Sequence, residues 1–400
     1  MALPIAFVIT GLLVILGLSY TQVIQEYPSG GGSYEVARKT LGTIPGLVTA
    51  AALIVLYLLN VAVSLTTGVD AIASTFPVLW EHKAILSLLL LLGMTALNLR
   101  GMRETGIIMA LPVYLFVFSY FCMLGYGGFH LAVAGTPPPS ILPAAVQPLT
   151  PTLMLLTFSA GCTALTGVAA ISNGVPSFRS PETKNASQVM TVMVFIMGLL
   201  FLGSVAMIQL LAVVAGPQET VLSAFAHRIF GTGLGYLIIQ SSTFLILGLG
   251  ANTSFAALPT MMSVMASDNY LPKGLAKMNS REVLVNGIIL LSGASALLIV
   301  AFSGNSHALV PLFAVGSVLT WTLSQIGMAI HWRRKRGNGW RRKALLNGLG
   351  AFATAVIFVV IGSLKFFEGA WIAVLLVPIL VAIFLRVHKR HGECPVQGLP

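Results

Sequence analysis

The sequence has few charged residues. Of its 400 residues only 8% are Asp, Glu, Lys or Arg, whereas 56% are hydrophobic. In water-soluble globular domains about a quarter of the residues are charged, so this composition excludes a soluble globule. It predicts an integral membrane protein instead.

Other absences exclude further classes of protein. The three cysteines, Cys122, Cys162 and Cys394, have no zinc or redox spacing, and no disulfide framework is implied. There is neither a phosphate-binding loop for ATP nor a nucleophile motif, and the seven histidines form no metal-binding pattern. We therefore expect no enzyme activity, no cofactor and no metal. The amino-terminal run has neither a basic start nor a small-residue cleavage site, so it is expected to remain as a span.

Long apolar runs recur along the whole chain. A run of about 20 residues is needed to cross roughly 30 Å of hydrocarbon as a helix. Eleven runs meet this need, near 3–22, 45–68, 83–99, 107–134, 151–175, 189–215, 234–256, 283–303, 307–330, 344–364 and 370–386. The sequence thus predicts an all-α polytopic protein with one transmembrane domain over 1–386 and a short tail over 387–400.

The basic residues are distributed asymmetrically between the predicted loops. If the spans alternate in direction, 19 of the 22 Lys and Arg residues fall on one side, and only Lys83, Arg228 and Lys365 fall on the other. The basic-rich side of a membrane protein is usually cytoplasmic. This places the C-terminus in the cytoplasm of a multi-pass protein in the cell membrane. The net charge of +11 then indicates contact with the anionic lipid of the bilayer and not with nucleic acid.

Five loop and span segments resemble those of one transporter superfamily. They are SYTQVIQEYPSGGGSYEVARKTLG at 19–42, NLRGMRETG at 98–106, SAGCTALTGVAAISNGVPSF at 159–178, ANTSFAALPTMMSVMASDNYLP at 251–272 and PLFAVGSVLTWTLSQIGMAIHW at 311–332. In this order they are similar to the amino acid–polyamine–organocation permeases, and within them to the high-affinity potassium importers.

The resemblance implies a leucine-transporter-like fold of two inverted five-helix repeats. The eleven spans would correspond to helices two to twelve of a twelve-helix transporter. The first helix, and the large cytoplasmic domain that often follows the last helix in potassium importers, would then be missing from these 400 residues.

Three consecutive glycines stand in the first cytoplasmic connector. Glycine tolerates positive φ and close backbone approach, so Gly30, Gly31 and Gly32 predict a tight re-entrant turn against the bundle. The resemblance implies that this connector forms part of an inner gate. A flexible loop is the alternative.

A polar stripe runs along the second span. Tyr57, Asn60, Ser64 and Thr67 follow a helical spacing of i, i+3, i+7 and i+10, which places them on one face. The resemblance implies that Tyr57, Asn60 and Ser64 face the substrate. The alternative for Asn60 is a hydrogen bond between helices that serves packing alone.

The fifth span contains the second set of candidate substrate-binding residues. Gly161 and Gly167 bracket the sequence CTALT, where a weakened helix can expose backbone groups in mid-membrane. The remaining candidates from this span and from the ninth are Ser159, Thr163, Thr166, Gly167 and Phe313. Serine and threonine in membrane helices also commonly bond to their own helix, and this alternative stays open.

Two positions depart from the potassium importers. These importers have Asp where this chain has Leu56, and commonly Glu where it has Ala169. The leading hypothesis is a secondary transporter of an amino acid or a small cation such as potassium. A truncated or regulatory paralogue that does not transport is the alternative. The sequence leaves open whether the chain forms a homodimer.

Overall fold

The computed structural model of the chain describes residues 2–28, 31–101, 106–134, 150–165, 167–277 and 284–392. Within these ranges the chain forms helices and turns and no β-strand, which confirms the all-α prediction. The α-helices are α1 (Ala2–Glu26), α2 (Gly32–Leu41), α3 (Thr43–Thr75), α4 (Lys83–Leu99), α5 (Gly106–Ala134), α6 (Pro151–Gly161), α7 (Val168–Asn173), α8 (Glu182–Leu210), α9 (Val221–Phe230), α10 (Leu234–Ser267), α11 (Val285–Ala301), α12 (Ser306–Lys335), α13 (Trp340–Leu364) and α14 (Trp371–Gly392). The short helices are 3-10 turns at Pro77–His82, Cys162–Leu165, Val175–Ser177 and Lys273–Ala276 and a π-helical turn at Phe366–Ala370.

Each of the eleven predicted spans contains helix. Among the described residues, nine helices are long and apolar enough to cross a membrane. The predicted span near 283–303 forms the shorter helix α11, whose 17 residues rise about 25 Å. The fifth predicted span, at 151–175, is interrupted and consists of α6, a 3-10 turn and α7.

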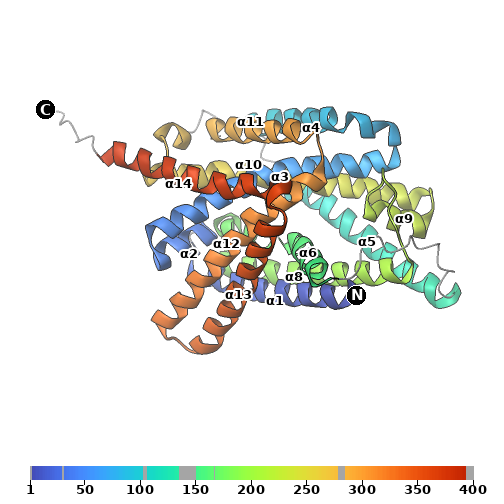
Figure 1. The fold of residues 1–400 in the computed structure, drawn as a ribbon, viewed down its shortest axis with the longest axis horizontal. Coiled ribbons are helices and arrows are strands. Elements are labelled where there is room, and N and C mark those ends of the chain that lie inside the picture. The colour runs from blue at the N-terminus through green and yellow to red at the C-terminus, as the bar shows by residue number, and fades with distance from the viewer. Residues whose placement is uncertain are drawn as a thin grey trace.

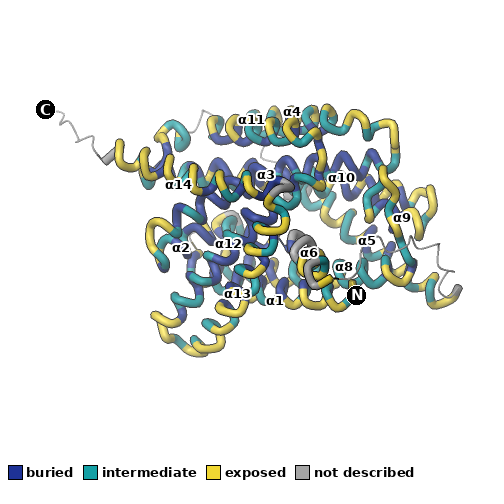
Figure 2. The backbone as a smooth tube through the Cα atoms, in the orientation of Figure 1, coloured by how far each residue is buried: buried dark blue, intermediate teal, exposed yellow. Residues whose placement is uncertain are grey.

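The helices are arranged around α3 and α12 (Figure 1). In their apolar stretches 83% of the residues of α3 and 72% of those of α12 are buried, against 11% in α4, α5 and α8. Figure 2 shows the same gradient, with buried backbone in the middle and exposed backbone on the surrounding helices. Large apolar side chains such as Leu111, Phe195 and Phe352 are about 70% exposed on that outer surface. Apolar surface of this extent is compatible with lipid and not with water.

The helix α1 runs from the N-terminus to the end of the molecule where α2 lies, and α9 lies at the opposite end (Figure 1). The α2 end carries the residues that the charge distribution predicts to be cytoplasmic. In the described residues, several of its basic side chains pair with acids: Arg38 with Asp268, Lys39 with Glu35 and Lys335 with Glu26.

Several helices are longer than the runs that predict them, and three of these extend furthest at their C-terminal ends. The helix α3 continues to Thr75 and α10 to Ser267, and α14 continues to Gly392, past the predicted boundary at residue 386. Polar residues that follow an apolar run can stay helical when nothing breaks the helix. In α3 the break comes at Pro77, because proline disfavours helical geometry in the residue before it.

Candidate functional site

The interrupted helix lies where the two glycines predict it. The helix α6 ends at Gly161, a 3-10 turn spans Cys162–Leu165, and α7 begins at Val168 after Gly167. The helix α7 has only six residues and ends at Asn173, followed by Gly174. A helix that is broken inside the bundle has backbone groups free for a ligand, which is the usual use of such breaks in transporters.

Tyr57 of the α3 stripe contacts the end of this broken segment. Its hydroxyl oxygen accepts a hydrogen bond from Asn173 Nδ2 at 2.7 Å, and only 8% of the residue is exposed. The other amide atom, Asn173 Oδ1, is buried and has no hydrogen-bond partner among the described residues. A buried amide oxygen without a partner is costly and leaves an acceptor available next to Tyr57.

Asn60 joins the same stripe to α10. Its Nδ2 donates to the carbonyl oxygen of Gly250 at 3.0 Å and to Ser254 Oγ at 2.9 Å. The stripe therefore faces two different elements, α7 through Tyr57 and α10 through Asn60. This geometry is also compatible with a purely structural role for Asn60, because both hydrogen bonds join α3 to α10.

Ser64, one turn further along α3, lines a cavity of about 400 Å³ between α3, α4, α5 and α10. The polar residues of its lining also include Asn98 and Asn252, whose side chains bond to each other at 2.9 Å. The remainder of the lining is mainly apolar. The size and the few polar groups are those of a small-molecule cavity.

The glycine connector is packed against the broken segment. Gly31 and Gly32 have φ of 79° and 40°, and α2 begins at Gly32. A Cβ atom on Gly32 would lie 2.1 Å from Asn173 Oδ1 and 2.8 Å from Ser172 Oγ. Positive φ and this close approach explain why glycine is required at residue 32. Gly30 lies outside the described residues.

The helix α2 is also tied to α10 on the predicted cytoplasmic side. Arg38 Nη1 donates to Asp268 Oδ2, and the Tyr34 hydroxyl donates to the same oxygen at 3.1 Å. Burial and the nearby Asp268 carboxylate raise the pKa of Tyr34 to about 12, so it stays a neutral donor at physiological pH. The connector is thus held between α7 and the end of α10.

The other candidates are placed as follows. Phe313 is buried in α12. Just beyond it on the same helix, the hydroxyls of Ser317 and Thr320, which are not among the candidates, donate to carbonyls of α12 itself. These two hydroxyls therefore match the alternative of local bonding. Ser159 lies in α6 and Thr163 in the 3-10 turn, but their side-chain contacts fall outside the described part of the chain, as does Thr166.

Sequence reasoning did not single out Asn173, Ser254 or Asp70. Asn173 and Ser254 lie inside the quoted segments, but neither belongs to the polar stripe that the spacing in α3 indicates. The predicted span ends near residue 68, so Asp70 falls just beyond it, yet it lies inside α3 and is 2% exposed. The signal for it was present, because residue 70 continues the stripe three residues after Thr67.

The site has no carboxylate at the two positions that depart from the potassium importers. Leu56 is 6% exposed and Ala169 is 2% exposed, so both positions are filled by buried apolar side chains. Among the described residues no group of three or more His, Cys, Asp and Glu side chains could hold a metal ion. Where the structure describes it, the site is built of neutral hydroxyl, amide and carbonyl groups.

Comparison with known proteins gives the family. A family model described as "Amino acid permease" matches residues 1–385. The chain belongs to the amino acid permease family. It is 39% identical over 393 residues to the potassium transporter KimA of Bacillus subtilis strain 168, which covers 98% of this chain and 65% of that protein. This permease chain thus spans slightly less than two thirds of that relative. It is also 26% identical over 349 residues to the low-affinity putrescine importer PlaP of Escherichia coli strain K12, which covers 82% of this chain and 72% of the importer.

Proposed function

We propose that the chain is a secondary transporter that moves an amino acid or a small cation such as potassium across the cell membrane by alternating access. The proposal rests chiefly on one observation: the polar stripe of α3 contacts both the end of the broken segment, through Tyr57 and Asn173, and α10, through Asn60. A broken helix beside a polar stripe offers backbone and side-chain groups to a solute within the bundle. Similarity to a potassium transporter and to a putrescine importer supports the same proposal.

The substrate class is inferred from the neutral groups that Tyr57 and Asn60 contact among the described residues. A dication would need compensating carboxylates, since an unpaired buried charge is costly. A zwitterionic amino acid has no net charge, and its carboxylate and amino groups can be bonded by backbone amides and by acceptors such as Asn173 Oδ1. A potassium ion would be held only by neutral oxygens.

We expect Asn60→Ala to reduce solute uptake at least about tenfold in proteoliposomes that contain the 400-residue chain. The substitution removes two hydrogen bonds at the stripe, each worth about 1 kcal/mol. Uptake of labelled neutral amino acids and of rubidium, as a potassium analogue, is measured for both proteins.

The control is Asn286→Ala, because exposed Asn286 bonds a single backbone carbonyl, that of Gly274 in the 3-10 turn Lys273–Ala276. It should leave uptake unchanged. If the unmodified chain takes up none of the solutes, the non-transporting paralogue is favoured instead. The apolar residues at positions 56 and 169 are consistent with that alternative.

The proposed orientation places the C-terminus in the cytoplasm. A reporter enzyme fused after Pro400 should be active only if it folds in the cytoplasm, and a cysteine at residue 140 should react with an impermeant maleimide from outside. The physical reason is the excess of Lys and Arg on the opposite side. Reaction of that cysteine only in inside-out vesicles would reverse the orientation.

A further inference from the structure

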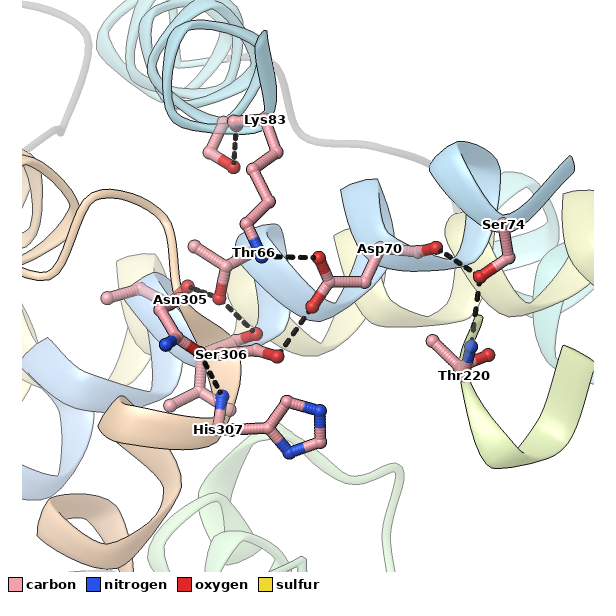
Figure 3. A network of polar contacts seen from close by, with 11 residues as sticks. Thr66, Asp70, Ser74, Lys83, Thr220, Asn305, Ser306 and His307 are labelled. Carbon is pink, nitrogen blue, oxygen red and sulfur yellow. Dashed lines mark hydrogen bonds and ion pairs between the residues drawn. The ribbon is translucent and has the colours of Figure 1, made fainter. Parts of the chain in front are cut away.

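Asp70 is the one charged residue that is buried in the described part of the chain. It lies in α3, five residues before the helix ends at Thr75. Its Oδ2 accepts a hydrogen bond from Ser306 Oγ at 2.5 Å, and its Oδ1 lies 3.4 Å from Lys83 Nζ (Figure 3). The side chain therefore joins α3 to the first residue of α12 and to the first residue of α4.

The chain is shaped locally to bring these three elements together. Ser303 and Gly304 have φ of 50° and 66°, so the connection from α11 turns sharply before α12. A Cβ atom on Gly304 would lie 3.0 Å from both N and Cα of Ala84, which shows how closely the turn approaches the start of α4. Asn305 then caps α12 by accepting from the amide of His307, and Ser306 faces Asp70 (Figure 3).

Energetics argue that the contact specifies an arrangement more than it adds stability. A buried carboxylate loses its hydration, and here it is compensated by Ser306, by the positive end of α12 and by Lys83 at a longer distance. Apolar residues of similar size often replace buried ion pairs without loss of stability. The buried Asp70 carboxylate therefore indicates that α3, α4 and α12 must meet at this point.

The opposite end of α12 is closed by different partners. On the predicted cytoplasmic side, Lys335 bonds to Glu26 of α1 at 2.5 Å, and Arg334 donates to the carbonyl of Thr40 in α2 at 3.1 Å. One buried helix thus has a polar contact to α3 at one end, where Asp70 also pairs with Lys83 of α4, and polar contacts to α1 and α2 at the other. Alternating access requires contacts at one end to open while those at the other stay closed.

We propose that Asp70, Ser306 and Lys83 form an outer latch that closes the extracellular end of the transporter and opens once in each transport cycle. Asp70 is a positioning residue in this latch: it acts by holding Ser306 of α12 and Lys83 of α4 against α3. The inference rests on the proposed transport function for its role, but its test does not require uptake.

The test uses two matched reporters on α3. Thr66 and Thr49 are 1% and 0% exposed, and each hydroxyl bonds the carbonyl four residues earlier, of Ala62 and Pro45. Thr66→Cys lies one turn below Asp70, and Thr49→Cys lies near the cytoplasmic end of the same helix. Both are made in chains whose Cys122, Cys162 and Cys394 are replaced by alanine, and each is combined with Asp70→Asn, Ser306→Ala or the exposed control Glu81→Gln.

An impermeant maleimide is applied to right-side-out vesicles for Thr66→Cys and to inside-out vesicles for Thr49→Cys. Asp70→Asn and Ser306→Ala should speed labelling of the outer reporter at least about fivefold, the shift that roughly 1 kcal/mol produces in a two-state equilibrium. The inner reporter should not become faster, and Glu81→Gln should change neither. The milder Ser306→Ala keeps the test decisive if Asp70→Asn folds poorly.

Two results would overturn the latch. Faster labelling of both reporters would mean that the substitutions merely loosen the bundle, and unchanged labelling of the outer reporter would mean that the junction does not close it. The labelling is measured without any solute. A chain that fails to transport can therefore still support or overturn the latch. The uptake assay with Asn60→Ala tests the proposed function separately.

Discussion

Gly32→Ala is expected to abolish uptake and to lower the thermal stability of the protein. The added Cβ would lie 2.1 Å from Asn173 Oδ1, far inside van der Waals contact, and φ at residue 32 is 40°. Left-handed geometry costs an alanine about 1–2 kcal/mol, and overpacking typically costs a further 1–3 kcal/mol. The connector would have to move away from α7, and the contact of Asn173 with Tyr57 would be disturbed with it.

Gly31→Ala separates the two causes. Gly31 also has positive φ, 79°, but its Cβ position meets only the Glu35 side chain, at the ordinary contact distances of 3.6 and 3.8 Å. This control should show the backbone strain without the collision, and hence a smaller loss of stability and most of the uptake. Equal effects of the two substitutions would show that the approach to Asn173 is unimportant.

A double substitution adds a second check. Asn173→Ala removes the atom that the new Cβ would strike, so Gly32→Ala should cost less stability in that background than in the original chain. Additive losses in unfolding temperature would contradict the packing of the connector against α7. The measurement is thermal unfolding in detergent, with uptake by the same four proteins in proteoliposomes.

The number and order of the spans could be predicted from sequence because they depend on a single physical demand. Every backbone amide in lipid must bond within its own segment, so a span needs about 20 apolar residues and little else. The break in the fifth span was also predictable, because Gly161 and Gly167 weaken a short apolar stretch. Helix ends were less predictable, and α3 runs seven residues beyond its apolar run.

The site was only partly predictable, because helix periodicity says which residues share a face and not what that face meets. The stripe places Tyr57, Asn60 and Ser64 on one face of α3, but the partners of Tyr57 and Asn60 come from segments more than a hundred residues away, at Asn173 and at Gly250. The burial of Asp70 was not predicted from the sequence, because a carboxylate near the end of an apolar run is normally solvated. In the structure Asp70 is buried where α3 meets Ser306 of α12 and Lys83 of α4.

The role of Gly32 in the connector could be recognised only from the structure. Three glycines predict a turn, but the short helix α2 and its ion pair from Arg38 to Asp268 follow from contacts with α10. Gly31 has open space around its Cβ position apart from Glu35, whereas Gly32 does not. The sequence alone treats the two glycines alike.

The chain is expected not to rescue a potassium-uptake-deficient strain at micromolar potassium. The potassium importers that it resembles have carboxylates at the positions of Leu56 and Ala169, and these positions are apolar and buried here. A carboxylate about 4 Å from a cation contributes roughly 4 kcal/mol at an effective dielectric constant of about 20. Even a quarter of that value for each lost carboxylate weakens binding by a total of about 2 kcal/mol, or roughly thirtyfold.

The matched test introduces the carboxylates as Leu56→Asp with Ala169→Glu, and compares them with the uncharged pair Leu56→Asn with Ala169→Gln. Growth at low potassium should improve only with the charged pair, provided that both proteins reach the membrane in equal amounts. Rescue by the unmodified chain at micromolar potassium would show that neutral oxygens suffice to hold the ion. Uptake of a neutral amino acid that does not respond to potassium would assign the site to amino acids, because the neutral groups of Tyr57, Asn60 and Asn173 need no counter-charge to bind a zwitterion.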